Sequence, residues 1–151
     1  MMNGSVKIRP AIQADIDAMS KLLSQLFTIE ADFEPDDEKQ RRGLQMLLDA
    51  LGAYVLVAEE QGSIIGMVTV QVLVSTAEGG HVGLVEDVVV DKEYRGRGVG
   101  AALLDQLKVW AEDNGLTRLQ LAADRDNSDA LEFYAGKGWE QTNLGLLRFG
   151  G

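Results

Sequence analysis

Residues 86–100 read Glu-Asp-Val-Val-Val-Asp-Lys-Glu-Tyr-Arg-Gly-Arg-Gly-Val-Gly. The three consecutive valines, Val88 to Val90, are typical of a strand that is covered on both faces. Glycines at positions 96, 98 and 100 indicate a turn. Apolar residues then recur at helical spacing from Val99 until Asn114-Gly115 stops the helix. The sequence therefore predicts a buried strand, a glycine turn and a helix in direct succession.

This junction suits a phosphate or a pyrophosphate. The first turn of a helix carries unpaired N–H donors and a partial positive charge, and glycines let a ligand approach the backbone closely. Arg95 and Arg97 add fixed positive charge to the turn. We therefore expect residues 95–101 to bind a phosphate-bearing ligand.

Two other phosphate-loop patterns compete for the same residues. A P-loop needs Gly-Lys-Ser/Thr after its second glycine, and Gly100-Ala101-Ala102 does not supply it. Gly96-x-Gly98-x-x-Ala101 does fit the dinucleotide fingerprint, and Asp124 follows the next expected strand as a candidate ribose-binding acid. That fingerprint usually opens a domain of several βαβ units, whereas only about fifty residues follow here. On the turn alone, the dinucleotide interpretation stays open.

Hydrophobic periodicity predicts one α/β domain over residues 1–151, with a mixed sheet. Asp15 is expected to cap the first helix, and Gly62 to lie in a hairpin turn. Strands are expected at 6–9, 54–58, 64–74, 84–90 and 119–122, with one or two more within 139–149. Helices are expected at 16–29, around 44–51, at 99–111 and from 127 to Gly138.

Composition excludes several classes of function. The chain of 151 residues has no cysteine, which rules out disulfides, thiolate metal sites and a cysteine nucleophile, and a single histidine, His81, cannot form a His-rich metal site. A formal net charge of -10 argues against general nucleic-acid binding. No apolar run is long enough to span a bilayer, and residues 1–10 lack the apolar region of a signal peptide. We therefore expect a cytoplasmic protein.

Two motifs carry a family resemblance. Arg95-Gly96-Arg97-Gly98-Val99-Gly100 resembles the Arg/Gln-x-x-Gly-x-Gly/Ala pyrophosphate loop of the GNAT family of N-acetyltransferases. Asn127-Ser128-x-Ala130-x-x-Phe133-Tyr134-x-x-x-Gly138-Trp139 is similar to that family's second CoA-contacting segment. Order and spacing match over residues 84–139, and the first eighty residues fit more loosely.

The resemblance implies an acyl-CoA N-acyltransferase fold: a central mixed sheet of six to seven strands, flanked by about four helices, with a splay between the fourth and fifth strands. Acetyl-CoA would lie in that splay as the acyl donor, and no metal is expected. The cofactor-binding residues that the resemblance implies are Val88, Val89, Val90, Arg95, Gly96, Arg97, Gly98, Val99, Gly100, Ala101, Asn127 and Tyr134.

Acetyl transfer requires a neutral amine, and deprotonating an alkyl ammonium at neutral pH costs about 4 kcal/mol. The resemblance places Glu86 near the thioester as general base and the Val88 N–H as an oxyanion donor, and it makes Tyr134 the acid that protonates the departing thiolate. The alternative interpretations are a solvated strand-edge acid for Glu86 and a core tyrosine for Tyr134. Asp87 would point to the opposite face if the strand is regular.

The acceptor is expected to be a primary amine of a small molecule or peptide. Six carboxylates within residues 30–38 suit a cationic acceptor such as a polyamine, an aminoglycoside or a lysine side chain, although a solvated charged loop is an alternative interpretation. Glu30, Glu34, His81 and Glu86 are the substrate-binding candidates. The resemblance also implies a homodimer through the C-terminal strands, where Leu144, Leu146, Leu147 and Phe149 are apolar.

The sequence thus favours an N-acetyltransferase that moves an acetyl group directly from acetyl-CoA to an amine. A non-catalytic CoA-binding sensor is the alternative from another class, and a dinucleotide-binding protein is a third.

Overall fold

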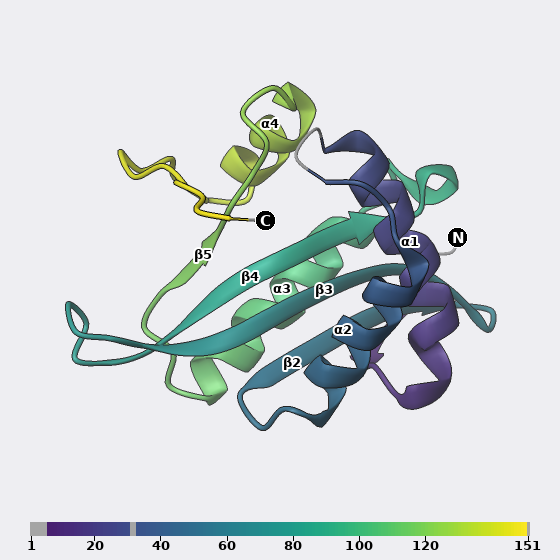
Figure 1. Ribbon diagram of the computed structural model, residues 1–151, viewed down its shortest axis with the longest axis horizontal. Helices are drawn as coiled ribbons and strands as arrows, with labels where there is room; N and C mark the ends of the chain where they lie inside the picture. The colour runs from purple at the N-terminus through teal and green to yellow at the C-terminus, as the bar shows by residue number, and fades with distance from the viewer. Residues whose placement is uncertain (1–5, 31–32, 151) are drawn as a thin grey trace. The chain divides into compact units, whose positions relative to one another are not determined.

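The computed structural model describes residues 6–30 and 33–150 (Figure 1). Asp32, one of the six carboxylates of the acidic stretch, lies outside the described residues. The chain divides into two compact units, Met1–Leu121 and Ala122–Gly151. The first unit contains the sheet and three of the long helices, and the second contains one helix.

The first unit is built on a five-stranded sheet. Its strands follow one another in space as they do in the chain. They are β1 (Val6–Pro10), β2 (Ala53–Glu60), β3 (Ser63–Ser75), β4 (Gly80–Val90) and β5 (Leu119–Leu121). The first four pair antiparallel, and β5 pairs parallel to β4, so the sheet is mixed as the sequence predicts.

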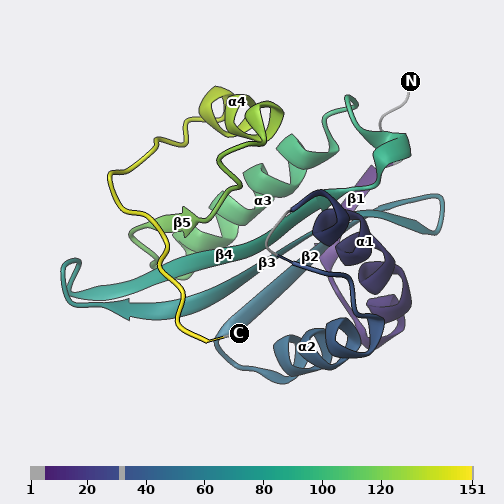
Figure 2. The same cartoon turned by 45° about the horizontal axis from the view of Figure 1, so that its top comes forward.

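Helices cover both faces of this sheet (Figures 1 and 2). α1 (Ile16–Ile29) and α2 (Asp37–Asp49) cover one face, where Met19, Leu22 and Leu44 form a core with Met67 and Val89 of the strands. α3 (Val99–Asp113) covers the other face, where Val99 and Leu103 pack closely on Gly66 of β3. The apolar faces that the sequence pattern predicted for these helices are thus the faces that pack on the sheet.

The hairpin turn at Gly62 forms as the sequence predicts, whereas the Asp15 side chain does not cap the first helix as predicted. Gln61 and Gly62 both have positive φ, at 49° and 83°, which is the two-residue turn that suits a right-twisted hairpin. Asp15 does precede α1, but its side chain makes no cap hydrogen bond. Its carboxylate instead accepts from Arg9 at 2.7 and 3.0 Å and from the Ile12 N–H at 2.8 Å, which ties β1 to the start of α1.

The second unit corrects the predicted strand count. It contains α4 (Ser128–Gly136), and residues 137–150 form no strand. The prediction of one or two closing strands within 139–149 is therefore wrong, and the sheet of the described chain has five strands rather than six to seven. A strand needs a neighbouring strand to satisfy its backbone, and the described part of this unit offers none. The prediction of about four helices is confirmed by α1 to α4, besides two short 3-10 helices.

Candidate functional site

β4 has a free edge, which we define as the backbone of residues 86–90 on the side away from β3. β5 pairs with β4 at Gly83, Leu84 and Val85, and the described strands pair with nothing beyond that point on this side. The Asp91 N–H donates to the carbonyl of Ile65 in β3 at 2.8 Å. Because successive residues of an antiparallel strand point their backbone groups to opposite sides, those of Val88 and Val90 face the free edge.

The N-terminus of α3 follows this edge in the chain. Gly98 is the N-cap, with φ at 81°, and Gly96 also lies in the left-handed region with φ at 79°. In the described part of the chain, no side chain caps the helix, and its first turn contains no acid. The N–H groups of Val99, Gly100 and Ala101 therefore keep no side-chain acceptor, and a helix end of this kind binds anions.

The two arginines of the turn have different contacts. Arg95 Nε donates to the Val90 carbonyl at 3.1 Å, so its guanidinium lies at the end of β4. The Arg97 guanidinium lies 5.1 Å from the centre of the Tyr94 ring, in the 3-10 helix Lys92–Tyr94. Both side chains are exposed, so both cations are accessible to an anionic ligand.

Glu86 lies at a β-bulge. The register between β3 and β4 passes from Thr69 opposite Asp87 to Val70 opposite Val85, so Glu86 is an extra residue of β4. Its side chain is exposed. The bulge falls one residue past the last β5 pair, which puts Glu86 at the start of the free edge.

Asp87, an acid that the sequence analysis did not assign to the site, lies next to Glu86 at the bulge. Asp87 is half-buried, and its carboxylate accepts from the hydroxyl of Thr69 at 2.7 Å. Burial raises the pKa of Asp87 to about 6, with the charge of Glu86 adding to the rise and the Thr69 hydrogen bond opposing it. The strand is not regular here, so the alternation that set Asp87 apart from Glu86 does not hold. An acid within a run of valines was the only sequence signal for it.

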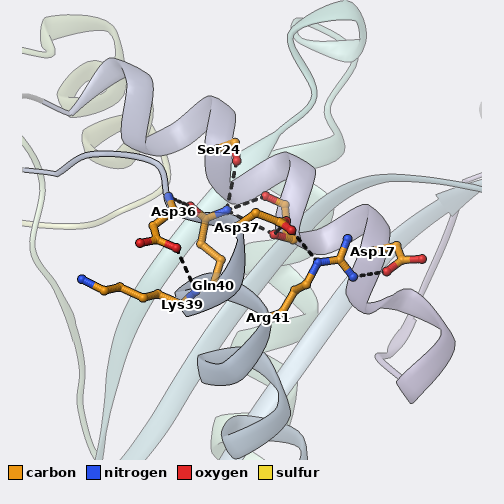
Figure 3. A network of polar contacts seen from close by, with 8 residues as sticks. Asp17, Ser24, Asp36, Asp37, Lys39, Gln40 and Arg41 are labelled. Atoms are coloured by element: carbon orange, nitrogen blue, oxygen red, sulfur yellow. Dashed lines mark hydrogen bonds and ion pairs between the residues drawn. The ribbon is translucent and has the colours of Figure 1, made fainter.

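Two acids of the acidic stretch, Asp36 and Asp37, form structural contacts, which Figure 3 shows. Asp36 caps α2 by accepting from the Lys39 N–H, and Asp37 accepts from Ser20 at 2.6 Å and from Arg41 at 2.7 Å. Gln40, which is buried, donates to the carbonyl of Ser20 in α1 at 2.9 Å. This network fixes α2 against α1 and so fixes one end of the acidic stretch.

The remaining substrate-binding candidates are spread over the first unit. Glu30 ends α1, and Glu34 is exposed in the connection to α2. His81 is exposed near the start of β4, opposite Val74 of β3. Glu86 is five positions after His81 along the strand, or about 16 Å away at the usual rise. The structure therefore does not bring His81 to Glu86.

In the second unit, Asn127 caps α4, with its side chain accepting from the Ala130 N–H at 3.1 Å. Tyr134 is half-buried on the same helix, and its ring lies 6.1 Å from that of Trp139 in an edge-on arrangement. The Trp139 N–H donates to the carbonyl of Tyr134 at 3.0 Å, just after the turn at Gly138, whose φ is 92°. The predicted order of asparagine, tyrosine-bearing helix and Gly-aromatic turn is therefore present.

Comparison with known proteins identifies the family. The profile of the Acetyltransferase (GNAT) family matches residues 16–139. An aminoglycoside N(6')-acetyltransferase type 1 from Stenotrophomonas maltophilia is 30% identical over 146 residues, which are 94% of this chain and 91% of that protein.

Solved structures share the fold. A possible acetyltransferase from Clostridium difficile 630 superposes with a TM-score of 0.84 at 21% identity, covering 96% of this chain and 97% of that one. An aminoglycoside acetyltransferase from an uncultured soil metagenomic sample superposes with a TM-score of 0.80 at 23% identity, covering 99% of both chains.

The fold and the family profile together define an N-acyltransferase. The chain belongs to the Acetyltransferase (GNAT) family. Within residues 6–30 and 33–150, no group of three or more histidines, cysteines or acids is arranged to hold a metal ion. In the same residues, no helix has the length and apolar character that crossing a membrane requires.

Proposed function

We propose that this enzyme transfers an acetyl group from acetyl-CoA directly to a primary amine. The observation that carries the proposal is the free edge of β4, which leads through the glycine turn into the uncapped N-terminus of α3. An extended ligand with amides and a pyrophosphate fits both features. The amides would pair with the backbone of Val88 and Val90, and the pyrophosphate would accept from the N–H groups of Val99 to Ala101.

The remaining cofactor-binding residues support this placement. Left-handed glycines at 96 and 98 leave the turn without side chains on the ligand side. Val89 is buried in the core on the α1 side, so it would hold the strand while its neighbours bind the ligand. Arg95 and Arg97 would contribute charge, and Asn127 would contact the ligand while it caps α4.

The chemistry needs a base, an oxyanion donor and an acid. We propose that Glu86 accepts the amine proton, directly or through water, and that the Val88 N–H stabilises charge on the carbonyl oxygen. As the new C–N bond forms, the C–S bond breaks, and Tyr134 donates its proton to the thiolate. These roles require the two units to act as one acetyltransferase domain, which the family profile over residues 16–139 supports.

The acceptor that we propose is a cationic amine, with an aminoglycoside as the first candidate. Two observations support it: the relative named as an aminoglycoside acetyltransferase, and the formal net charge of -10. Glu30 and Glu34 would face such a cation from the acidic stretch, in which Asp36 caps α2 and Asp37 binds Ser20. For His81 we propose at most a contact with a long acceptor, given its distance from Glu86.

Thiol release tests the proposal. The chain is incubated with acetyl-CoA and a panel of amines, namely kanamycin, spermidine and a lysine-containing peptide. We expect thiol release with at least one amine, and Glu86→Gln to lower kcat about 100-fold at pH 7, with partial recovery at higher pH where more amine is neutral. Glu112→Gln, at an exposed position of α3, serves as the control. Tyr134→Phe is compared with Tyr54→Phe, since Tyr54 stacks on Trp110 away from β4.

The amine panel and a thermal-shift measurement also test the two alternative functions, a CoA-binding sensor and a dinucleotide-binding protein. CoA binding without thiol release from any amine would favour the non-catalytic sensor. Stabilisation by NAD but not by CoA in a thermal-shift measurement would favour the dinucleotide interpretation and refute the proposal.

We also propose a homodimer through the C-terminal segment. Leu144, Leu146, Leu147 and Phe149 are 80% to 104% exposed, and such a cluster is unusual on the surface of a monomer. Light scattering at micromolar concentration should give the mass of a dimer. Replacing Leu147 and Phe149 by serine should give a monomer, and a wild-type chain that is monomeric would refute this proposal.

A further inference from the structure

The β-bulge at Glu86 is held by a contact between two strands. Thr69 of β3 lies opposite Asp87 of β4, at the point where the register skips Glu86. The Thr69 hydroxyl donates to the Asp87 carboxylate at 2.7 Å. The same hydroxyl oxygen accepts from the Asp87 N–H at 3.2 Å. One side chain thus binds both the backbone and the side chain of the residue next to Glu86.

This contact is rigid. Thr69 is fully buried at 0% exposure, and a β-branched side chain has few χ1 rotamers. Among the described residues, none forms an ion pair with the Asp87 carboxylate, in contrast to Asp15, which binds Arg9. Burial without a counter-charge raises the pKa of Asp87, so the carboxylate lies here at a cost. Positions that cost stability are often retained for function.

The contact between Thr69 and Asp87 lies at the start of the free edge of β4. β5 leaves β4 after Val85, the bulge follows at Glu86, and the free edge continues through Val88. A bulge redirects side chains and increases the local twist of a strand. We propose that Thr69 and Asp87 are positioning residues that lock the bulge and so hold the Glu86 carboxylate in place beside Val88. The inference rests on the proposed role of Glu86 as the base.

Thr69→Val tests the lock, because it keeps the shape of the side chain and removes the hydroxyl. We expect kcat to fall about 10-fold or more, within the hundredfold that a misplacement of about 1 Å can cost. KM for acetyl-CoA should change little, since the hydrogen bonds of the Thr69 hydroxyl join it to Asp87 and not to the proposed pyrophosphate site. Thr69→Ser, which keeps the hydroxyl, should restore kcat. The assay uses acetyl-CoA with the amine of the kanamycin, spermidine and peptide panel that releases thiol fastest.

The chain offers a matched control. Asp15 is also buried, and its carboxylate accepts from Arg9 at 2.7 Å, but it ties β1 to the start of α1. Asp15→Asn should therefore lose stability as Thr69→Val does and keep wild-type kcat. Equal losses of kcat in both variants would show a general effect of destabilisation and would overturn the proposal.

A double-mutant cycle tests whether the two residues act as a pair. Asp87→Ala and Thr69→Val are combined, and kcat is measured for each single variant and for the double variant. If the residues act through one contact, the double variant falls no further than the worse single variant. Multiplicative losses would mean that Thr69 and Asp87 act independently, and the positioning role would be refuted.

Backbone amide NMR gives a readout that does not depend on turnover. In the ¹⁵N-labelled chain without substrate, Thr69→Val should shift the amide signals of Glu86 and Asp87, and Thr69→Ser should return them. Unmoved signals would refute the lock itself. Moved signals with unchanged kcat would refute its catalytic role. A wild-type chain that binds CoA and releases no thiol would instead refute the proposed function, and the role of the lock in catalysis with it.

Discussion

Replacing Gly98 by alanine should separate cofactor binding from folding. Gly98 has φ at 81°, in the left-handed region that costs a residue with a Cβ about 1–2 kcal/mol. An added Cβ would meet nothing within 4 Å, so the cost comes from the backbone alone. We expect the free energy of unfolding to fall by about 1 kcal/mol, which lowers the melting temperature by about 3 °C in a domain of this size. If the turn relaxes, the N–H groups of α3 no longer converge, and CoA binding should weaken about 10-fold, or 1.4 kcal/mol.

Calorimetry of two ligands measures the binding effect. Gly98→Ala should weaken the binding of CoA and leave that of acetyl-pantetheine, which has no pyrophosphate, nearly unchanged. Gly43→Ala is the control, because Gly43 lies within α2 with open space around it and no positive φ; there alanine should stabilise the chain by about 0.5–1 kcal/mol. Equal loss of affinity for both ligands, or unchanged affinity for CoA, would refute the assignment of the pyrophosphate to the start of α3.

Two further predictions concern pH. Because the pKa of Asp87 is about 6 in the folded chain against an ordinary 3.8, its ionisation lowers the stability of the fold as the pH rises from 3.8 to about 6, and by the full amount above that. Asp87→Asn should therefore raise the free energy of unfolding by about 1–2 kcal/mol at pH 8, with no gain below pH 3.8, as urea titrations at both pH values can measure. Arg9 lowers the pKa of Asp15, so this carboxylate stabilises the fold above its ordinary pKa, and the contribution is lost as the pH falls. Asp15→Asn should lower the free energy of unfolding by about 2–3 kcal/mol at pH 7, whereas Asp17→Asn, at an exposed pair with Arg41, should lower it by less than about 0.5 kcal/mol. Equal effects of the two substitutions would contradict the stabilising role of the Arg9–Asp15 pair.

The central part of the fold could be predicted because its signals are local. Three consecutive valines predict a strand, and β4 contains them, although of the three only Val89 is buried. Glycines at alternate positions make a turn whose φ values only glycine adopts readily. The helix that follows has its apolar face against the sheet. Each of these features depends on neighbours in the chain, so the sequence contains what is needed to predict them.

The bulge at Glu86 could not be predicted because it depends on a partner from another strand. Thr69 lies 18 residues before Asp87, and nothing in the pattern of either strand indicates that they face each other across a skipped residue. A regular alternation was the simplest expectation, and it set Asp87 apart from the site. The assignment of a role to Asp87 therefore required the register of the sheet.

The bulge was not predicted although it is present, whereas the closing strands within 139–149 were predicted and do not form. The apolar residues Leu144, Leu146, Leu147 and Phe149 favoured a closing strand, but apolar residues do not supply a partner strand. Charge alone also could not indicate which acids of the acidic stretch form structural contacts. Asp36 and Asp37 form hydrogen bonds at the start of α2, while Glu34 is exposed. Composition predicted a charged surface, and hydrogen bonds decided which of its acids are available.

A crystal structure of the chain with CoA would test the central claim most directly. We predict that the pantetheine amides pair with the backbone of Val88 and Val90 along the free edge of β4, and that the pyrophosphate accepts from the N–H groups of Val99 to Ala101. CoA bound elsewhere, or bound with the free edge unpaired, would contradict the account.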